Sequence, residues 1–337
     1  MKILLIMLAV ILPALGRAGP VREYPVYQLK SEPVVDGNLE EDVWAEIPEA
    51  GGFYIHDTGS YSENRYALVK PTRFKAGWTK DSLFMAVYCA ETAPDKLTDN
   101  GVLWANDSME MFFYPAKSDY YVQLLVNARG RRGNGKVFPQ RQSDGGGTQT
   151  AWEWTAKTQV GKESWTLEAR IPFKVLGNPP VEGEKWRVNV ARNLLTGPAN
   201  ERCTCWPDLS AGKKGFHSLD QFGVFVFRGN ELSAGAVERL ERDVNQDYLA
   251  FLQGRIMDLA RMGDKFQAGI EDGLRREKLR EQAENLKMLW DWVGQSAKNP
   301  KARWQDLSQG YGKCWDLNDR SLGFNAKVNL ESLFDTP

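Results

Sequence analysis

The sequence predicts a mainly β protein: an antiparallel β-sandwich, immunoglobulin-like or jelly-roll, followed by a small α-helical hairpin or bundle. Two observations predict the sandwich. Short segments with apolar residues at every second position fill residues 72–227, and turn signals such as Thr79-Lys80-Asp81 separate them. A third observation predicts the helices. After about Gly229 the apolar residues recur every three or four positions, the period of an amphipathic helix.

The first residues have the pattern of a secretory signal. Lys2 forms a short basic region, residues 3–12 are apolar, and small residues at positions 14, 16 and 18 suit cleavage. This apolar run is too short to span a membrane, and no later segment reaches that length. We therefore expect residues 1–18 to be a signal peptide and the protein to be secreted, either periplasmic or extracellular.

We expect the sandwich over residues 19–229. A short strand, an Asp36-Gly37 turn and one helical turn come first and end at Trp44, which we expect to be buried. A glycine-rich stretch, residues 130–147, divides the strands that follow into two groups. Alternation predicts strands at residues 72–78, 82–90, 109–114, 120–127, 151–159, 164–171, 185–193 and 222–227.

We expect the helical region over residues 230–337. The apolar pattern predicts one helix over about 237–259 and a longer one over about 266–293. A break is expected at residues 262–264, because Gly263 favours a helix C-terminus and Asp264 an N-cap. A shorter third helix is expected to open near Pro300. The charges of this region alternate in sign, which is typical of a solvated face and also compatible with a protein partner.

Composition and cysteine spacing narrow the classes of partner and site. The chain has 43 basic and 44 acidic residues and no basic cluster, so a nucleic-acid partner is not expected. Cys203 and Cys205 are one residue apart, near the upper limit of disulfide reach in an extended strand. Cys89 lies on the apolar side of a strand, where a buried free thiol is expected. Zinc is disfavoured because the sequence has no Cys-x-x-Cys motif and no histidine close to the cysteines.

A loop and strand at residues 103–114 hold side chains suited to a polyhydroxylated ligand. Trp104 lies in the loop, and Glu110 follows six residues later in the strand. An indole face covers the C–H face of a sugar ring, while a carboxylate accepts hydrogen bonds from the hydroxyls. The alternative is that Trp104 belongs to the core and Glu110 is merely solvated.

Other stretches of the β region could join this site. Gln123 and Asn127 share one face of their strand with Tyr121. Arg192 ends an apolar row, so it must either enter a polar pocket or be paired, because burying it unpaired is too costly. Trp206 lies in a turn-forming context after Cys205.

Successive motifs of the β region resemble, in order, those of family 9 carbohydrate-binding modules. They cover about residues 30 to 228. The motifs are Val35-Asp36-Gly37 with Trp44, Trp78 with residues 83–87, and residues 107–112, 165–173, 186–192 and 222–224. The resemblance implies a β-sandwich that grips the end of a glycan between two tryptophans, helped by polar side chains and often accompanied by structural calcium.

The resemblance also implies roles for individual residues. Trp104 resembles the first tryptophan of the clamp, and Glu110 its hydroxyl-binding carboxylate. Trp206 resembles the second tryptophan, and Arg192 a sugar-contacting arginine. Gln123 and Asn127 match by strand position. The sequence departs from the family pattern where cysteines flank Trp206 and where the glycine-rich stretch is long.

We therefore expect an exported, non-catalytic protein that binds a polysaccharide or oligosaccharide and is associated with polysaccharide breakdown. No cofactor is expected apart from calcium, for which carboxylates such as Asp36 or Asp57 are open candidates without a regular loop motif. A different reading makes the helices the working part, as a docking element of a cell-surface complex. In that case the helical tryptophans, Trp290, Trp304 and Trp315, would matter.

Two further readings give the sandwich itself another function. A glycoside hydrolase would use Asp107 and Glu110 as acid and base, but residues three apart on an extended strand face opposite sides of a sheet. A haem-binding sandwich would need histidine or methionine axial ligands. The candidates are His56, His217, Met85, Met109 and Met111, and methionines that alternate within a strand belong more often to the core.

Overall fold

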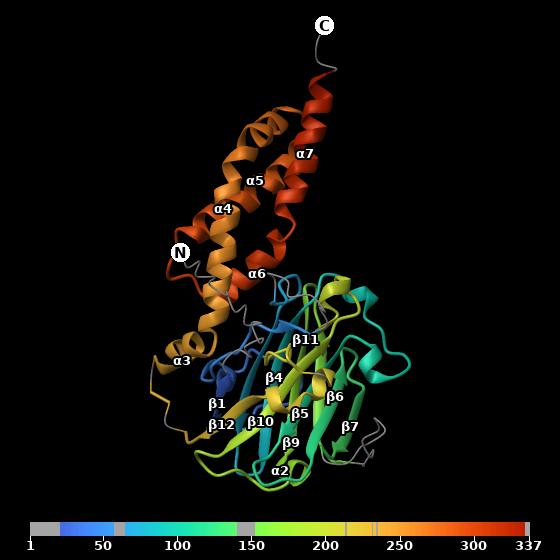
Figure 1. Cartoon of the computed structure of the whole chain (residues 1–337), viewed down its shortest axis with the longest axis vertical. Helices are drawn as coiled ribbons and strands as arrows, with labels where there is room; N and C mark the ends of the chain where they lie inside the picture. The colour runs from blue at the N-terminus through green and yellow to red at the C-terminus, as the bar shows by residue number, and fades with distance from the viewer. Residues whose placement is uncertain are drawn as a thin grey trace, which may run out of the picture.

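The computed structural model describes residues 21–56, 65–139, 152–212, 214–230, 232–233 and 235–333. The expected signal peptide and Asp57 lie outside the described residues. A β-sandwich forms one part of the molecule, and a group of helices stands on one end of it (Figure 1).

The sandwich has two layers, as the sequence predicts. One layer holds β7 (Arg132–Val137), β6 (Tyr121–Asn127), β5 (Ser108–Tyr114), β10 (Lys185–Asn193) and β12 (Gly223–Arg228), in that order. The other holds β3 (Thr72–Trp78), β4 (Ser82–Ala90), β9 (Ser164–Pro172) and β8 (Thr155–Val160). The first strand, β1 (Glu23–Gln28), joins the layers by pairing parallel with both β12 and β3. All other strand pairings among the described residues are antiparallel.

Alternating side chains fill the space between the layers. Met109, Met111 and Phe113 of β5 point into this core and are fully buried, as their spacing predicts. A smaller cluster around Phe112 covers the opposite face of β5. Cys89 is a buried free thiol, as expected. Glu110 lies between Met109 and Met111, so the same alternation places it on the face of β5 that points away from the main core.

Short elements connect the strands and cover their ends. Among the described residues these are α1 (Asp42–Ala45), β2 (Tyr54–Ile55), η1 (Pro94–Lys96), η2 (Leu103–Ala105), α2 (Phe173–Leu176), η3 (Ala199–Glu201), β11 (Cys203–Cys205), η4 (Gly215–His217) and η5 (Leu219–Gln221). Trp44 of α1 is buried, as expected. Strand β7 lies within the glycine-rich stretch, where the sequence predicted no strand, because its glycines leave no alternating apolar pattern.

The described helical region contains five helices: α3 (Ala236–Val244), α4 (Gln246–Arg275), α5 (Arg280–Ala297), α6 (Trp304–Cys314) and α7 (Leu317–Ser332). The predicted break at residues 262–264 is wrong, since α4 continues through it and ends at Arg275. Gly263 is needed for packing rather than for ending a helix. A Cβ atom built on it would lie 3.2 Å from Cε3 of Trp290 on α5.

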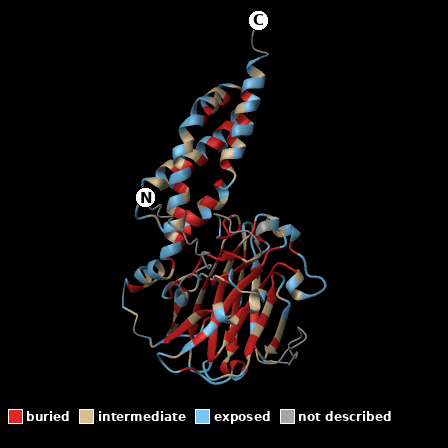
Figure 2. Cartoon of the chain, viewed as in Figure 1, coloured by how far each residue is buried: buried red, intermediate tan, exposed pale blue. Residues whose placement is uncertain are grey.

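The helices pack directly onto the end of the sandwich. The ring of Trp304 lies where a Cβ of Gly51 would stand, 2.3 Å from its Cζ3. Asn245, between α3 and α4, accepts a hydrogen bond from the Gly51 N–H at 2.7 Å and donates one to the Glu49 carbonyl at 2.8 Å. Buried residues therefore continue from the sandwich into the helices (Figure 2). No helix in the described part of the chain has the length and apolarity needed to cross a membrane.

Candidate functional site

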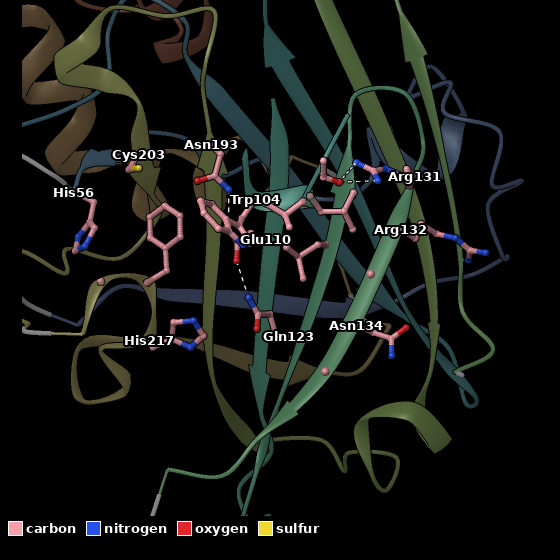
Figure 3. Close-up of a pocket in the computed structure, with 18 of the residues that line it drawn as sticks. His56, Trp104, Glu110, Gln123, Arg131, Arg132, Asn134, Asn193, Cys203 and His217 are labelled. Carbon is pink, nitrogen blue, oxygen red and sulfur yellow. Dashed lines mark hydrogen bonds between the residues drawn. The ribbon is translucent and has the colours of Figure 1, made fainter. Parts of the chain in front are cut away.

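A cleft of about 1090 Å³ opens on the outer side of the layer that contains β5, β6 and β7. Three of the predicted site residues, Trp104, Glu110 and Gln123, line it together. They lie near its middle, with His56 and His217 on one side and the β7 residue Asn134 on the other (Figure 3). The cleft therefore unites the loop–strand stretch at residues 103–114 with the three stretches expected to join it, which contribute Gln123, Asn193 and Cys203.

Trp104 is held in an exposed position by its own loop. The side chain of the buried Asn106 donates to the carbonyls of Asn100 at 2.8 Å and Val102 at 2.7 Å, and accepts the Asn100 N–H at 3.0 Å. These bonds close the loop that carries η2. The indole of Trp104 is 63% exposed, which is unusual for so large an apolar side chain and indicates a surface prepared for contact.

Glu110 supplies a carboxylate to the same cleft. It is 5% exposed, and its two carboxylate oxygens accept hydrogen bonds from Gln123 Nε2 and Asn193 Nδ2, both at 2.7 Å. Burial raises the pKa of Glu110, while the two amide hydrogen bonds act in the opposite direction. Each oxygen retains a lone pair, because a carboxylate has about four acceptor positions. The arrangement can accept further hydrogen bonds from hydroxyl groups.

Several cleft residues were not predicted from the sequence. Asn193 could have been found, because it lies opposite Ser108 in the β5–β10 pairing and two residues from Ala191, which lies opposite Glu110. No comparable signal existed for the residues of the far wall. That wall includes His56, Cys203, Phe216 and His217. They come from separate segments that meet only through the tertiary fold.

Trp206 lies away from the cleft, so its predicted role as the second clamp tryptophan is wrong for this structure. It has no exposed surface. Its ring packs edge-on against Phe74 at 5.4 Å and Tyr24 at 6.4 Å, inside the core of the sandwich. The physical reason lies in the backbone, because the Trp206 N–H bonds to the Val190 carbonyl at 2.8 Å and turns the indole inward.

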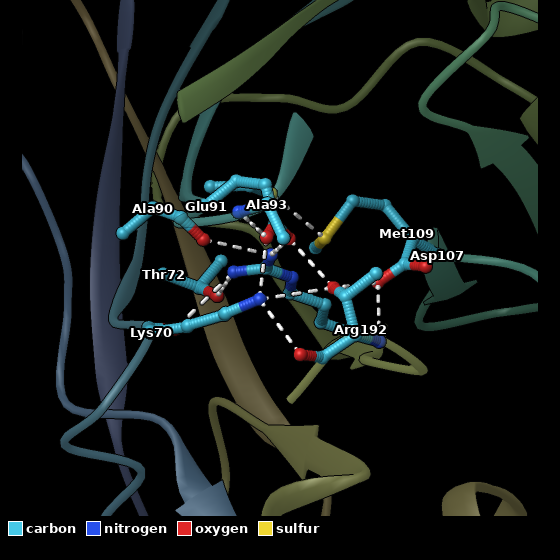
Figure 4. A network of polar contacts seen from close by, with 10 residues as sticks. Lys70, Thr72, Ala90, Glu91, Ala93, Asp107, Met109 and Arg192 are labelled. Atoms are coloured by element: carbon cyan, nitrogen blue, oxygen red, sulfur yellow. Dashed lines mark hydrogen bonds and ion pairs between the residues drawn. The ribbon is translucent and has the colours of Figure 1, made fainter. Parts of the chain in front are cut away.

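Arg192 is also buried rather than exposed to a ligand, so the structure contradicts its predicted contact with sugar. It lies in a polar network between the layers (Figure 4). It donates to the carbonyl of Lys70 and the hydroxyl of Thr72, both at 3.2 Å, and to the carbonyl of Ala90 at 2.9 Å. An oxygen of Glu91 lies 3.8 Å from its Nη2. Of the two alternatives that the sequence left open for this arginine, the structure shows pairing.

Glu91 is the centre of this network. Its carboxylate is ion-paired with Lys70 and also accepts hydrogen bonds from the Thr196 hydroxyl and the Ala93 N–H, both at 2.7 Å. Burial alone would raise the pKa of Glu91, but the hydrogen bonds from Lys70, Thr196 and Ala93 outweigh it and lower the pKa. The charges are thus compensated inside the protein and serve its structure.

Asn127, the remaining predicted site residue, stabilises a turn instead of lining the cleft. Its Nδ2 donates to Asp99 at 2.7 Å, and its Oδ1 accepts the N–H groups of Arg131 at 2.9 Å and Arg129 at 3.2 Å. The side chain is fully buried. It therefore has no surface to offer a ligand.

The acid–base pair of the hydrolase reading is not brought together in the described residues. Asp107 is buried and bonds to Thr196, so it does not share the cleft with Glu110 as an acid–base pair would need. Met85, Met109 and Met111 belong to the core. Across the described ranges, no three His, Cys, Asp or Glu side chains come together to hold a metal ion. Cys89, Cys205 and Cys314 form no disulfide.

Solved structures with a similar arrangement include carbohydrate-binding proteins. A family 9 carbohydrate-binding module from Caldicellulosiruptor kristjanssonii in complex with cellotriose is 17% identical, with a TM-score of 0.44 over 64% of this chain and 97% of that one. The same kind of module in complex with glucose is 16% identical, with a TM-score of 0.44 over 63% and 99%. A Bacteroides uniformis protein, provisionally described as carbohydrate-binding, is 15% identical, with a TM-score of 0.49 over 62% and 100%.

Comparison of the sequence with curated proteins finds no match. A family model gives a clear result. The model described as "Carbohydrate family 9 binding domain-like" matches residues 35–230, which is more than half of the 337 residues and ends within two residues of β12. The chain belongs to the carbohydrate family 9 binding domain-like family.

Proposed function

We propose that this protein binds carbohydrate in the cleft around Trp104 and Glu110. The observation that carries the proposal is that one cleft holds an indole that is 63% exposed and a carboxylate that is 5% exposed and held by two amides. The indole supplies an apolar face for the C–H groups of a sugar ring. The amides fix the carboxylate in place to accept hydroxyl hydrogen bonds. Family membership supports the same ligand class.

The second aromatic contact is assigned to Phe216 in place of Trp206. Phe216 lines the same cleft as Trp104, whereas Trp206 is buried in the core. The backbone carbonyl of Phe216 accepts a hydrogen bond from Asn189 Nδ2 at 3.0 Å, and its ring lies 5.4 Å from that of His56. A preformed wall of this kind reduces the entropy that the protein loses when it orders around a ligand.

The expected affinity is modest. Aromatic stacking and a few charge-assisted hydrogen bonds are set against the cost of immobilising a sugar, which gives a Kd between about 1 μM and 1 mM. We assign no catalytic role to the cleft, since Glu110 is its single acidic side chain among the described residues. A place in polysaccharide breakdown would then come from partner enzymes.

The test is calorimetric titration of the chain with β-glucan and xylan oligosaccharides. Binding of at least one of them is expected for the wild type, with loss of detectable heat in Trp104→Ala. Trp315→Ala is the matched control, because this tryptophan is 52% exposed but lies next to α6, away from the cleft. Absence of heat with every oligosaccharide, or equal binding by Trp104→Ala, would refute the proposal.

Export is a separate proposal that rests on residues 1–18. The chain expressed in a bacterial host is expected to appear outside the cytoplasm with this segment removed. N-terminal sequencing of the exported protein checks the cleavage. Recovery of the uncleaved chain from the cytoplasm alone would contradict it.

A further inference from the structure

The two histidines of the chain, His56 and His217, both line the cleft at its far wall. His217 is the better defined of the two. Its Nδ1 lies 2.7 Å from the hydroxyl oxygen of Tyr121, and its ring meets Phe112 edge-on at 5.2 Å. Contacts on two sides therefore fix the orientation of the imidazole.

Tyr121 holds His217 from the buried side. Tyr121 is 3% exposed and does not line the cleft, whereas His217 does. Since Nδ1 faces Tyr121, Nε2 lies on the other side of the ring, and no protein partner is recorded for it among the described residues. This nitrogen is the atom of His217 that is available to a ligand.

The hydrogen bond also selects a tautomer. Burial raises the pKa of Tyr121 to about 12, so the phenol keeps its proton at physiological pH. Among the described residues its hydroxyl bonds only to His217, and Phe112, Tyr114 and Phe222 surround its ring. A phenol that donates to Nδ1 leaves the neutral imidazole with its proton on Nε2. That N–H can then donate to a hydroxyl oxygen.

We propose that His217, positioned by Tyr121, is a carbohydrate-binding residue of the cleft whose Nε2–H donates to a hydroxyl group of the sugar, and that acid weakens this binding. The inference rests on the proposed function and adds a residue and a pH dependence to it. Donation complements Glu110, which accepts hydrogen bonds, so the cleft offers both partners that a neutral hydroxyl group can use.

The pH dependence follows from what protonation does at this position. A proton on Nδ1 would force the Tyr121 hydroxyl to turn its own proton into aromatic surroundings. Burial also lowers the pKa of His217, and a bound sugar would remove more solvent from the ring. We expect this loss of solvent to outweigh the stronger hydrogen bond that a charged imidazole would donate to the sugar, so that the complex binds protons less readily than the free protein does. By linkage, affinity is full above the pKa of free His217 and decreases as pH falls through it.

Other ionisable groups lie around His217. Tyr121 contacts it from the buried side, and the cleft also holds Glu110 on β5, Lys214 just before its own turn, His56 and Cys203 on the same wall, and Arg131 and Arg132 at the start of β7. The contribution of His217 must therefore be measured as a difference between variants.

The test is a calorimetric titration of four proteins: the wild type, His217→Ala, His217→Gln and Tyr121→Phe. The ligand is the oligosaccharide of the panel that binds most tightly, and each titration is made at about pH 7.5 and at about pH 5. At the higher pH, His217→Ala should raise Kd about tenfold. His217→Gln should stay within about threefold, since its amide places an N–H near the Nε2 position. The fall in affinity at low pH should be smaller in His217→Gln than in the wild type. Tyr121→Phe should weaken binding at the higher pH, because it removes the anchor of the imidazole.

The outcomes separate this inference from the proposed function. Wild type that binds no oligosaccharide at either pH would refute both. Wild type that binds, with His217→Ala matching it in affinity and in pH profile, would refute only the role of His217. Equal pH profiles for the wild type and His217→Gln would contradict the role of His217 in the pH dependence. They would assign that dependence to another group such as Glu110.

Discussion

Trp104 and Trp206 look alike in the sequence and differ most in the structure. Each lies in a turn near the end of a strand, and each resembles one half of an aromatic clamp. Trp104 is 63% exposed on a loop closed by Asn106, whereas Trp206 is fully buried against Phe74 and Tyr24. The same kind of local motif can therefore supply a surface tryptophan or a core tryptophan, and backbone pairing decides which.

The carboxylates repeat the same contrast. Glu91 is paired with Lys70 and lies near Arg192, and its pKa is lowered. Among the described residues, Glu110 accepts hydrogen bonds from the amides of Gln123 and Asn193 and has no ion-pair partner, and burial raises its pKa. Glu91 is therefore compensated by charge within the sandwich, whereas Glu110 is not.

The largest effect on stability is expected from Trp206→Ala. Removing a fully buried indole leaves a cavity in the core and should lower the free energy of unfolding by about 3–5 kcal/mol. Trp104→Ala should change it by less than about 0.5 kcal/mol, because the exposed indole loses few contacts. Urea unfolding of both variants measures the difference. Equal losses of unfolding free energy in the two variants would contradict the distinction between a surface tryptophan and a core tryptophan.

Glu91→Gln should come next. It leaves Lys70 and Arg192 in the interior without their carboxylate, and the expected loss is roughly 3 kcal/mol, since glutamine keeps one acceptor oxygen. The matched control is Glu153→Gln, which breaks the exposed pair with Lys174 and should leave the stability almost unchanged. Chemical denaturation of both variants near neutral pH tests the prediction. A loss in Glu91→Gln no larger than in the control would contradict the structural role of the network.

Glu110→Gln should affect binding more than folding. Replacing the carboxylate removes charge-assisted acceptance of hydroxyl protons, and Kd should rise roughly tenfold, about 1.4 kcal/mol. Glu46→Gln is the control, because this exposed carboxylate pairs with Lys30 outside the cleft. Calorimetric titration at constant pH compares the two. Unchanged affinity in Glu110→Gln would show that Glu110 does not contact the ligand.

Acid should reduce the contribution of Glu91 to the free energy of unfolding of the wild type. The folded-state pKa of Glu91 lies below its ordinary value of 4.5, so its stabilising contribution is complete above that value and is lost as pH falls through the folded pKa. The difference in unfolding free energy between the wild type and Glu91→Gln should therefore shrink below about pH 4.5. Denaturation series at several pH values measure it, and a difference that grows in acid would reverse the predicted sign.

The sequence predicts the sandwich well because alternation reports burial directly. It places Met109 and Met111 inside and Glu110 outside, and the structure agrees. It fails at Gly263, since a glycine that allows Trp290 to pack closely looks the same as one that ends a helix. The far wall of the cleft, including Phe216 and His217, was beyond local patterns, because it depends on contacts between segments far apart in the chain.

The most direct test follows the indole N–H signals of the twelve tryptophans by NMR while the tightest oligosaccharide is added. The Trp104 signal is assigned as the one missing from Trp104→Ala. A carbohydrate site at Trp104 requires this signal to shift with saturation while the signal of the buried Trp206 stays in place. Shifts confined to Trp206 or to the helical tryptophans, with Trp104 unmoved, would contradict a carbohydrate site at Trp104.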